Sequence, residues 1–310
     1  MSVHPILIAA AAILIAAGHA VAAPTVPAPA ISQAVRDAAK EMQAGRTAEG
    51  LARLDALAKA GDAGAGALLA EIYLLGLFDV PRDVRRGCDY ADAFKDLHRE
   101  ATHNFAQCLF DGEGRAKDLA QARVWYRKAL DAGFHQSGCA LGNMYVHGWG
   151  GPAEPEKGLA LCLAAAETGQ RDAQTDVGNH YLFGRGTARD YGKAREWYLK
   201  AANQGQANAA FTLAQMQWNG DGGPVDRSEA ARWWKVAYDK GRKDAALHLG
   251  NGELLQVIDQ VQAKAAPDLA TLDRAIAWFE RAALAPQAEV REKAAKGLDV
   301  ARELRNAVKK

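Results

Sequence analysis

Serine, aromatic residues and net charge are all scarce in this 310-residue chain. Only Ser2, Ser32, Ser137 and Ser228 occur, aromatic residues make up 7%, and 38 Lys and Arg against 37 Asp and Glu leave a net charge of +1. An alanine-rich, serine-poor composition favours closely packed helices, because small side chains let helix axes approach. A nucleic-acid partner would require a clustered basic surface, so the charge balance argues against one.

Long apolar runs are scarce as well. The longest, residues 6–17, is too short to cross a bilayer, which takes about 20 apolar residues. Ala20-Val21-Ala22 follows and fits a signal-peptidase site. We therefore expect a secretory signal peptide over residues 1–22, a Pro- and Ala-rich linker over 23–31, and no stable membrane span after cleavage. Because no Lys or Arg precedes the apolar run, an uncleaved anchor is the alternative.

Sequence motifs for catalysis are missing. No Ser is followed three residues later by Lys, and no G-x-S-x-G occurs. Gly186 and Gly192 are separated by five residues, whereas a phosphate-binding loop needs four. His98 and His103 are five residues apart, but two metal ligands on one helix face are four apart. We interpret both histidines as solvated or capping, and expect no enzyme activity, cofactor or metal site.

The strongest signal in the sequence is an internal repeat of 36 residues, which indicates a repeat architecture. Several sets of residues keep this step in one register. The glycines form two sets: Gly133, Gly169, Gly205 and Gly241, and Gly76, Gly112, Gly148, Gly184 and Gly220. The apolar sets are Trp125, Leu161, Trp197 and Trp233, then Ala129, Ala165, Ala201 and Ala237, then Phe105, Leu141, Val177, Leu213 and Leu249.

Each unit divides into two helices. In the fourth unit, helical spacing of apolar residues predicts a first helix over residues 172–183, and Gly184 follows where a left-handed cap is wanted. Asp190 can cap a second helix over 190–203 by accepting from free backbone N–H groups. Two other units repeat this cap with the spacing of a capping box, Asp118 with Gln121 and Asp226 with Glu229.

A single helical hairpin cannot bury both of its apolar stripes, so neighbouring units must stack. We therefore predict an all-α solenoid over residues 32–288, with about six stacked helix-turn-helix units. A charged capping helix is expected over 289–310. Trp233 and Trp278 lie 45 residues apart rather than 36, which predicts an insertion around residues 256–268.

The consensus of these units resembles the Sel-1-like repeat family, a subclass of tetratricopeptide-like α-solenoids. The matching pattern is Ala-x-x-Leu-Gly-x-x-Tyr-x-x-Gly-x-Gly, then Asp, Ala, Trp-Tyr and Ala-Ala with a closing Gly. Residues 173–205 carry it best and 101–240 carry it well, while 43–97 match loosely and the tail past Gly250 matches poorly. The resemblance implies a right-handed superhelix, a role as an adaptor in protein complexes and, as for many bacterial members, export.

We accordingly expect a periplasmic or secreted scaffold that binds a peptide or a partner protein in its concave groove. Two alternative functions stay open. The first is a cell-wall-associated factor or weak hydrolase, and the second is a secreted effector acting on a host protein. In stacks of this kind the first helices line the concave surface. One polar position, which we call the ladder, recurs there in six units: Glu71, Gln107, Asn143, Asn179, Gln215 and Asn251.

The ladder could bind an extended peptide backbone, since an amide offers both a donor and an acceptor. A solvated helix face is the alternative interpretation. His147, His180 and Trp218 fall near this face and could add contacts, and Trp149 is the aromatic residue expected to be exposed. The aromatic pairs Trp125-Tyr126, Trp197-Tyr198 and Trp233-Trp234 are expected in the core.

Four cysteines in an exported protein suggest disulfides. Cys139 and Cys162 fall on the two helices of one unit, on either side of its turn, so antiparallel packing would bring them together. Cys88 and Cys108 could link adjacent units. A small disulfide between Cys139 and Cys162 could replace the packed aromatic residues that other units have at these two positions. Four buried thiols are the alternative, and no pair has the spacing of a structural zinc site.

Overall fold

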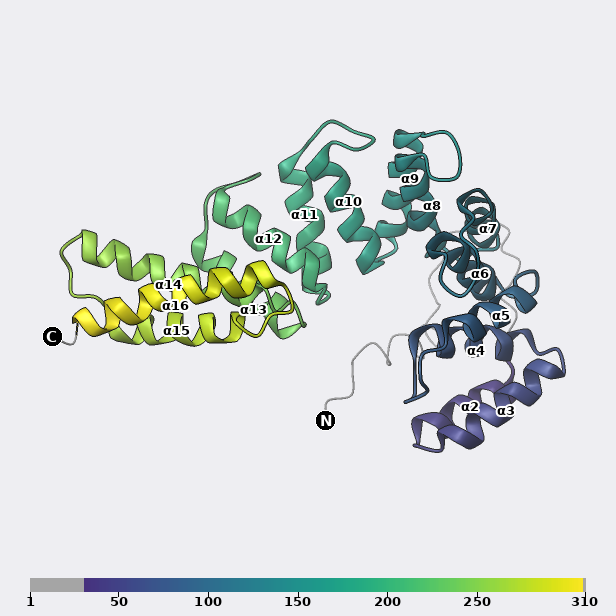
Figure 1. Cartoon of the computed structure of the whole chain (residues 1–310). Helices are drawn as coiled ribbons and strands as arrows, with labels where there is room; N and C mark the ends of the chain where they lie inside the picture. Colours follow the sequence, from purple (N-terminus) through teal and green to yellow (C-terminus); the bar gives the residue numbers. More distant parts are fainter. Residues whose placement is uncertain (1–30, 309–310) are drawn as a thin grey trace.

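The computed structural model describes residues 31–308, and every regular element in that range is a helix. The fold is an α-solenoid, and Figure 1 shows its helices following one another along an arch. The signal peptide expected over residues 1–22 lies outside the described residues, as does the linker up to residue 30. No helix within 31–308 is both long enough and apolar enough to cross a membrane.

The helices pair consecutively into antiparallel hairpins. The first helices of the pairs are α2 (Gln33–Gln43), α4 (Ala63–Leu75), α6 (Arg99–Asp111), α8 (Ser137–His147), α10 (Arg171–Phe183), α12 (Ala207–Asn219) and α14 (Ala245–Gln262). The second helices are α3 (Thr47–Lys59), α5 (Val84–Phe94), α7 (Leu119–Asp131), α9 (Pro155–Glu167), α11 (Tyr191–Asn203), α13 (Arg227–Asp239) and α15 (Leu269–Ala282). The last helix, α16 (Ala288–Val308), packs on α14 and α15.

The helix ends predicted for the fourth unit are confirmed within one residue by α10 and α11. Gly184 ends α10 in the left-handed conformation at φ 67°, which favours glycine. Asp190 caps α11, because its Oδ1 accepts a hydrogen bond from Lys193 N at 2.9 Å. The insertion expected around residues 256–268 lengthens α14 to 18 residues and the turn after it.

Only one of the two hydrogen bonds of a capping box forms, the one accepted by the aspartate side chain. Asp226 Oδ1 accepts from Glu229 N at 2.9 Å, but the backbone N–H of Asp226 donates to Gln217 O at 2.9 Å. That bond ties the second helix to the first and leaves no donor for the Glu229 carboxylate, which contacts Arg232 instead. Four other units make the same tie: Asp83 to Tyr73, Asp118 to Leu109, Glu154 to Tyr145 and Asp190 to Tyr181.

The core runs along the stack as clusters that span neighbouring hairpins. The second residue of each aromatic pair is buried, with Tyr126, Tyr198 and Trp234 at most 3% exposed. The first residue of each pair is half-buried between consecutive units. The pairs therefore form core as predicted, and each hairpin covers the apolar side of its neighbour.

The contact between α8 and α9 is closer than the repeat alone requires. Cys162 stands where other units have a large aromatic side chain, so the two helices must approach to fill the space. Glycine in both helices permits this approach, since a Cβ on Gly142 would lie 2.5 Å from Gly158 O and 2.8 Å from Cys162 Sγ. The Cα atoms of Cys139 and Cys162 are consequently only 4.0 Å apart.

Candidate functional site

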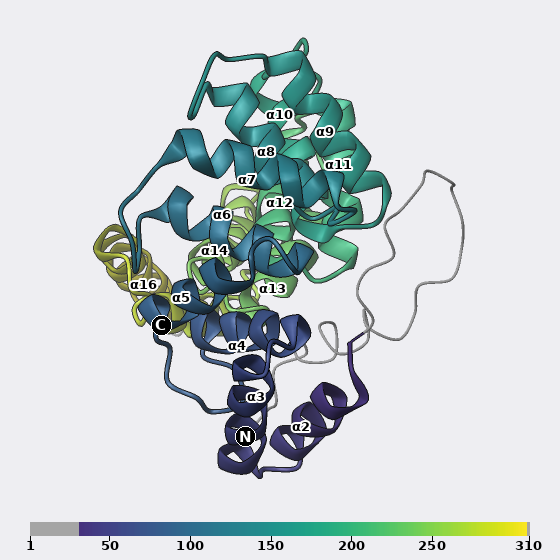
Figure 2. The same ribbon diagram turned by 90° about the vertical axis from the view of Figure 1, so that its right-hand side faces the viewer.

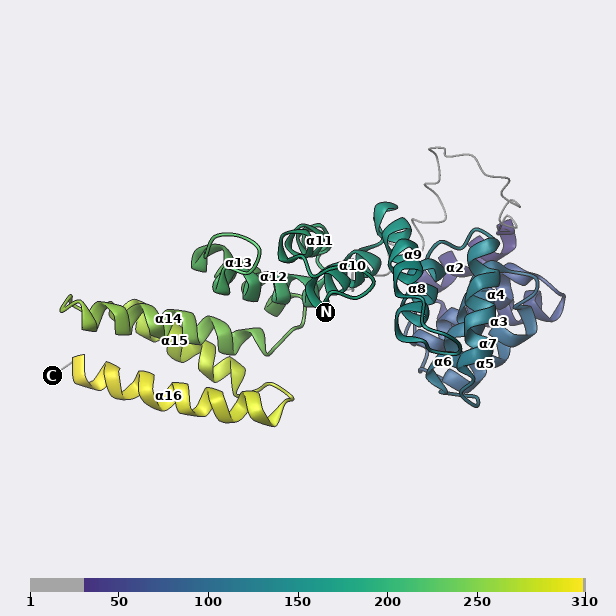
Figure 3. The same cartoon turned by 90° about the horizontal axis from the view of Figure 1, so that it is seen from above.

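The six ladder residues all lie on first helices, one in each hairpin from α4 to α14. Figure 3 shows α8, α10 and α12 along one side of the stack, with α9, α11 and α13 along the other. Figure 2 likewise shows α4, α6, α8 and α10 following one another. We call the face carrying the ladder the first-helix surface. Five ladder side chains are half-buried there, and Asn251 is exposed.

Each ladder residue belongs to a stripe that faces away from the core. On α10 the stripe consists of Asp172, Asp176, Asn179 and Phe183, which helical spacing places on one face. The corresponding positions of the other five first helices and their N-caps are half-buried or exposed as well. The six stripes contain no Lys or Arg, whereas they contain six carboxylates: Glu71, Glu100, Asp111, Asp172, Asp176 and Asp244.

Two ladder amides are held by buried tyrosines of the same hairpin. Tyr198 OH donates to Asn179 Oδ1 at 2.7 Å, and Tyr126 OH donates to Gln107 Oε1 at 2.5 Å. In both hairpins the tyrosine follows the amide by 19 residues. The bond fixes the orientation of the amide, because its oxygen faces the tyrosine and its NH₂ group points away from it. The sequence carries this spacing, but the partnership was not predicted.

Asn143 lacks such a tyrosine, because Cys162 occupies the equivalent place. Its Nδ2 instead donates to Asp176 Oδ2 of the next hairpin at 2.8 Å. Burial raises the pKa of Asp176, although the bond from Asn143 acts in the opposite direction. Burial and the neighbouring charge of Glu100 likewise raise the pKa of Glu71. Within residues 31–308, Glu71 and Asp176 thus lack a cationic partner and would gain from one, whereas Arg171 pairs with Asp172 and Arg242 with Asp244.

The remaining ladder side chains are free of such bonds. Glu71, Gln215 and Asn251 make no side-chain hydrogen bond with any residue in 31–308. A free amide next to held ones provides both a donor and an acceptor for an incoming chain. The ladder therefore divides into positions that hydrogen-bond within residues 31–308 and positions that do not.

The aromatic and histidine residues expected near the ladder differ in their exposure to solvent. His147 and Trp149 are exposed and stacked, with ring centroids 4.4 Å apart, and Trp149 is 38% exposed as predicted. Trp218 is half-buried against Trp234. The prediction for His180 is wrong, because this side chain is 2% exposed and takes the core position that methionine has in α8 and α12.

His98 is not solvated, contrary to expectation, and His103 is half-buried. His98 is 5% exposed, and its side chain does not cap α6 although it stands at the N-cap. His103 Nδ1 lies 2.9 Å from Ser137 Oγ, and burial lowers the pKa of His103 to about 4. Within residues 31–308, no three His, Cys, Asp or Glu side chains converge as a metal site would require.

The cysteines lie in the two pairs that the sequence suggests. Cys139 on α8 faces Cys162 on α9 within one hairpin, and Cys88 on α5 faces Cys108 on α6 across consecutive hairpins. The sulfur atoms of the two pairs are 2.10 Å and 2.03 Å apart, which is disulfide distance. The second pair would tie one repeat to the next.

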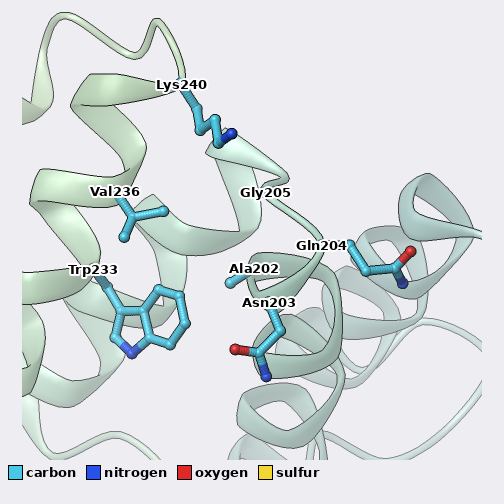
Figure 4. A pocket seen from close by; sticks show the side chains of 7 residues that line it. All are labelled: Ala202, Asn203, Gln204, Gly205, Trp233, Val236 and Lys240. Atoms are coloured by element: carbon cyan, nitrogen blue, oxygen red, sulfur yellow. The ribbon is translucent and has the colours of Figure 1, made fainter. Parts of the chain in front are cut away.

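A hollow of about 390 Å³ opens between α11 and α13, and Figure 4 shows Trp233 and Val236 of α13 on one side of it. Ala202 and Asn203 of α11 lie opposite. Lys240 is the single charged residue in its lining. The hollow brings together no nucleophile and general base, so its geometry suits apolar contact better than acid–base chemistry.

Comparison with known proteins finds the same repeat. The Sel1 repeat model matches residues 65–92, 99–134, 139–169, 171–206, 207–241 and 272–286. A Sel1 repeat protein from Oxalobacter formigenes is similar in structure, with a TM-score of 0.65, 22% identity, and coverage of 83% of this chain and 99% of that one. No curated protein matches the chain.

Two further solved structures are similar at a TM-score of 0.48. One is a protein of Klebsiella pneumoniae described as a sel1 repeat protein, with 22% identity over 65% of this chain and 98% of that one. The other is a protective antigen of uropathogenic Escherichia coli strains, with 26% identity over 75% of this chain and 56% of that one.

Proposed function

The chain belongs to the Sel1 repeat family, whose members generally act as scaffolds for protein–protein interaction, and we propose that it binds an extended peptide segment of a partner protein along the first-helix surface. The observation that carries the proposal is the ladder, a polar side chain kept at one register through six hairpins. Such a row can follow a peptide backbone, whose own donors and acceptors repeat along its length. The proposed role involves no catalysis.

The composition of the surface supports a binding role over a plain solvated face. An ordinary solvated helix face mixes charges of both signs, as the second helices do with Lys128, Lys200 and Lys235 beside their acidic residues. The stripes of the first-helix surface have carboxylates and amides but no Lys or Arg. This charge pattern favours a partner segment that carries lysine or arginine, because complementary charge selects partners and speeds their association.

A matched pair of variants tests the proposal. Within residues 31–308, the half-buried Gln215 side chain makes no hydrogen bond, so Gln215→Lys introduces a cation into the first-helix surface without breaking one. Gln121→Lys makes the same chemical change on the exposed side of α7. Binding is measured on an array of extended peptides that includes lysine-rich, neutral and acidic sequences.

We expect the unmodified protein to select basic peptides and Gln215→Lys to weaken that binding at least tenfold, while Gln121→Lys stays within about twofold. Equal binding by both variants would remove the first-helix surface as the site. Selection of acidic peptides would contradict the charge argument.

We also propose that the protein works in the periplasm or outside the cell. Two observations support this, the short apolar run at residues 6–17 and the two cysteine pairs at disulfide distance. Disulfides persist in oxidising compartments and are rare in the cytosol. Alkylation of the native protein before and after reduction, followed by mass measurement, counts the free thiols. Four free thiols in freshly isolated protein would contradict the proposal, and the mass also reveals whether residues 1–22 are removed.

A further inference from the structure

A cluster of cations surrounds the phenol of Tyr145, at the end of α8. Arg127 of α7 donates from Nη2 to Tyr145 OH at 3.2 Å. The guanidinium carbon of Arg123 lies 3.9 Å from the centre of the tyrosine ring, and Lys157 Nζ lies 4.1 Å from it. Three positive side chains from two second helices therefore converge on one aromatic residue that is itself 9% exposed.

The acidic residues nearby balance this cluster only in part. Glu154 accepts from Arg123 at 3.2 Å and from Lys157 at 3.0 Å. A fourth cation, Lys128, reaches no closer than 4.0 Å to the exposed carboxylate of Asp96. Within residues 31–308, Glu154 is thus the one carboxylate that accepts hydrogen bonds from these cations. With Asp96 at the limit of ion-pair distance, the four cations face two carboxylates and retain excess positive charge.

Arg127 is the least neutralised member of the cluster. It forms no ion pair with any carboxylate in residues 31–308, and its one side-chain hydrogen bond goes to Tyr145. Burial by itself would raise the pKa of Tyr145, but hydrogen bonds from Arg127, Lys157 and Arg123 hold that pKa below its usual value. Tyr73 has the same position two repeats earlier, and there burial raises the pKa.

The repeat fold does not require this cluster. Arg123 has a structural role, since its Nη1 donates to Pro152 O at 3.0 Å, and Arg195 makes the matching contact to Pro224 O two repeats later. Lys157 has a counterpart in the next repeat, where Lys193 lies over the ring of Tyr181. Leucine replaces Arg127 in the next two repeats, at Leu163 and Leu199. Packing of the repeat therefore does not explain Arg127, the cation that contacts the Tyr145 hydroxyl.

An open hollow of about 330 Å³ lies against the cluster. Its lining consists of Ala120, Arg123, Val124, Arg127, Lys128, Tyr145 and Gly150, which includes three cations and no carboxylate. We propose that this hollow binds an oxyanion, a phosphate or carboxylate group carried by a small molecule. Guanidinium groups match the geometry of both anions, and Lys128 and the Tyr145 hydroxyl would complete the donor set. A volume near the low end of ligand pockets suits a small ligand.

The site is separate from the peptide-binding role proposed above. No ladder residue lines the hollow, and the helices that supply its cations are second helices. The proposal consequently stands or falls independently of the first-helix surface.

Titration calorimetry at low ionic strength tests whether the hollow beside Tyr145 binds an oxyanion, with inorganic pyrophosphate in one arm and glutarate in the other. Arg127→Leu removes the least neutralised cation and installs the residue that the next two repeats already accommodate. The control is Lys235→Leu, which makes the same change of charge at the same position three repeats later. We expect one anion to bind with a stoichiometry of one, Arg127→Leu to weaken binding about tenfold or more, and Lys235→Leu to stay within twofold.

The two arms identify the source of the anion, since preference for pyrophosphate indicates a phosphate group and preference for glutarate a carboxylate. Absence of saturable binding in both arms would overturn the proposal. An Arg127→Leu protein that binds as well as the unmodified one would overturn it too, as would an equal loss in both variants.

Discussion

Replacing Gly142 by alanine probes whether the close approach of α8 and α9 is built on glycine. Alanine is the better helix former by about 1 kcal/mol, so by local propensity this change should stabilise the protein. The repeat also tolerates alanine here, since Ala106 and Ala214 occupy the same position in other hairpins. Only the tertiary structure opposes the change.

The expected magnitude follows from the contact. The new Cβ would lie 2.5 Å from Gly158 O, whereas ordinary contacts begin at 3.4 Å, so α8 and α9 would have to separate by about 0.9 Å. A backbone oxygen cannot rotate away, and Cys162 Sγ lies 2.8 Å from the same Cβ. Overpacking of this kind costs up to about 3 kcal/mol, which leaves a net destabilisation of about 2 kcal/mol after the gain in helix propensity.

Gly252 provides the control, because it lies inside the first helix α14 and its Cβ would come no closer than 3.5 Å to Trp218. Gly252→Ala should stabilise by about 0.5–1 kcal/mol, so the two variants should differ by about 3 kcal/mol. Urea denaturation followed by circular dichroism measures both. If Gly142→Ala unfolds at the same urea concentration as Gly252→Ala, glycine does not set the distance between α8 and α9.

Two further predictions concern buried polar groups. Burial, with the charges of Arg185 and His147, lowers the pKa of His180 to about 4. Above pH 6.5 the imidazole of His180 is neutral in both the folded and the unfolded protein. Between pH 6.5 and 4 the unfolded chain binds the proton more readily than the folded one. The free energy of unfolding should therefore decrease by up to about 1.4 kcal/mol for each unit by which the pH is lowered through this range. His180→Met should flatten this part of the denaturation profile, and an unchanged profile would refute the assignment. Tyr198→Phe should cost about 1 kcal/mol in urea denaturation by removing the donor to Asn179, and a neutral effect would show that the bond contributes nothing net.

The sequence by itself determined the helices and their order. The glycine after most first helices and the aspartate before most second helices are local signals, because a left-handed cap and an N-cap depend on one or two residues. Ends such as Gly184 and Asp190 could therefore be placed within a residue. The cysteine pairing was also accessible, since antiparallel helices of known length bring fixed positions together.

Only the tertiary structure decided which polar side chains are buried or hydrogen-bonded within the stack and which are not. His180 reads like a surface residue in its own helix, but its position faces the partner helix, where methionine packs in other repeats. Asn179 is held by Tyr198 from 19 residues away, while Gln215 in the next hairpin is free. The cations around Tyr145 come from two second helices, α7 and α9, and converge on a side chain of the first helix α8. These outcomes depend on pairs of positions that meet only when hairpins stack, and the repeat period fixes the meeting place but not the chemistry found there.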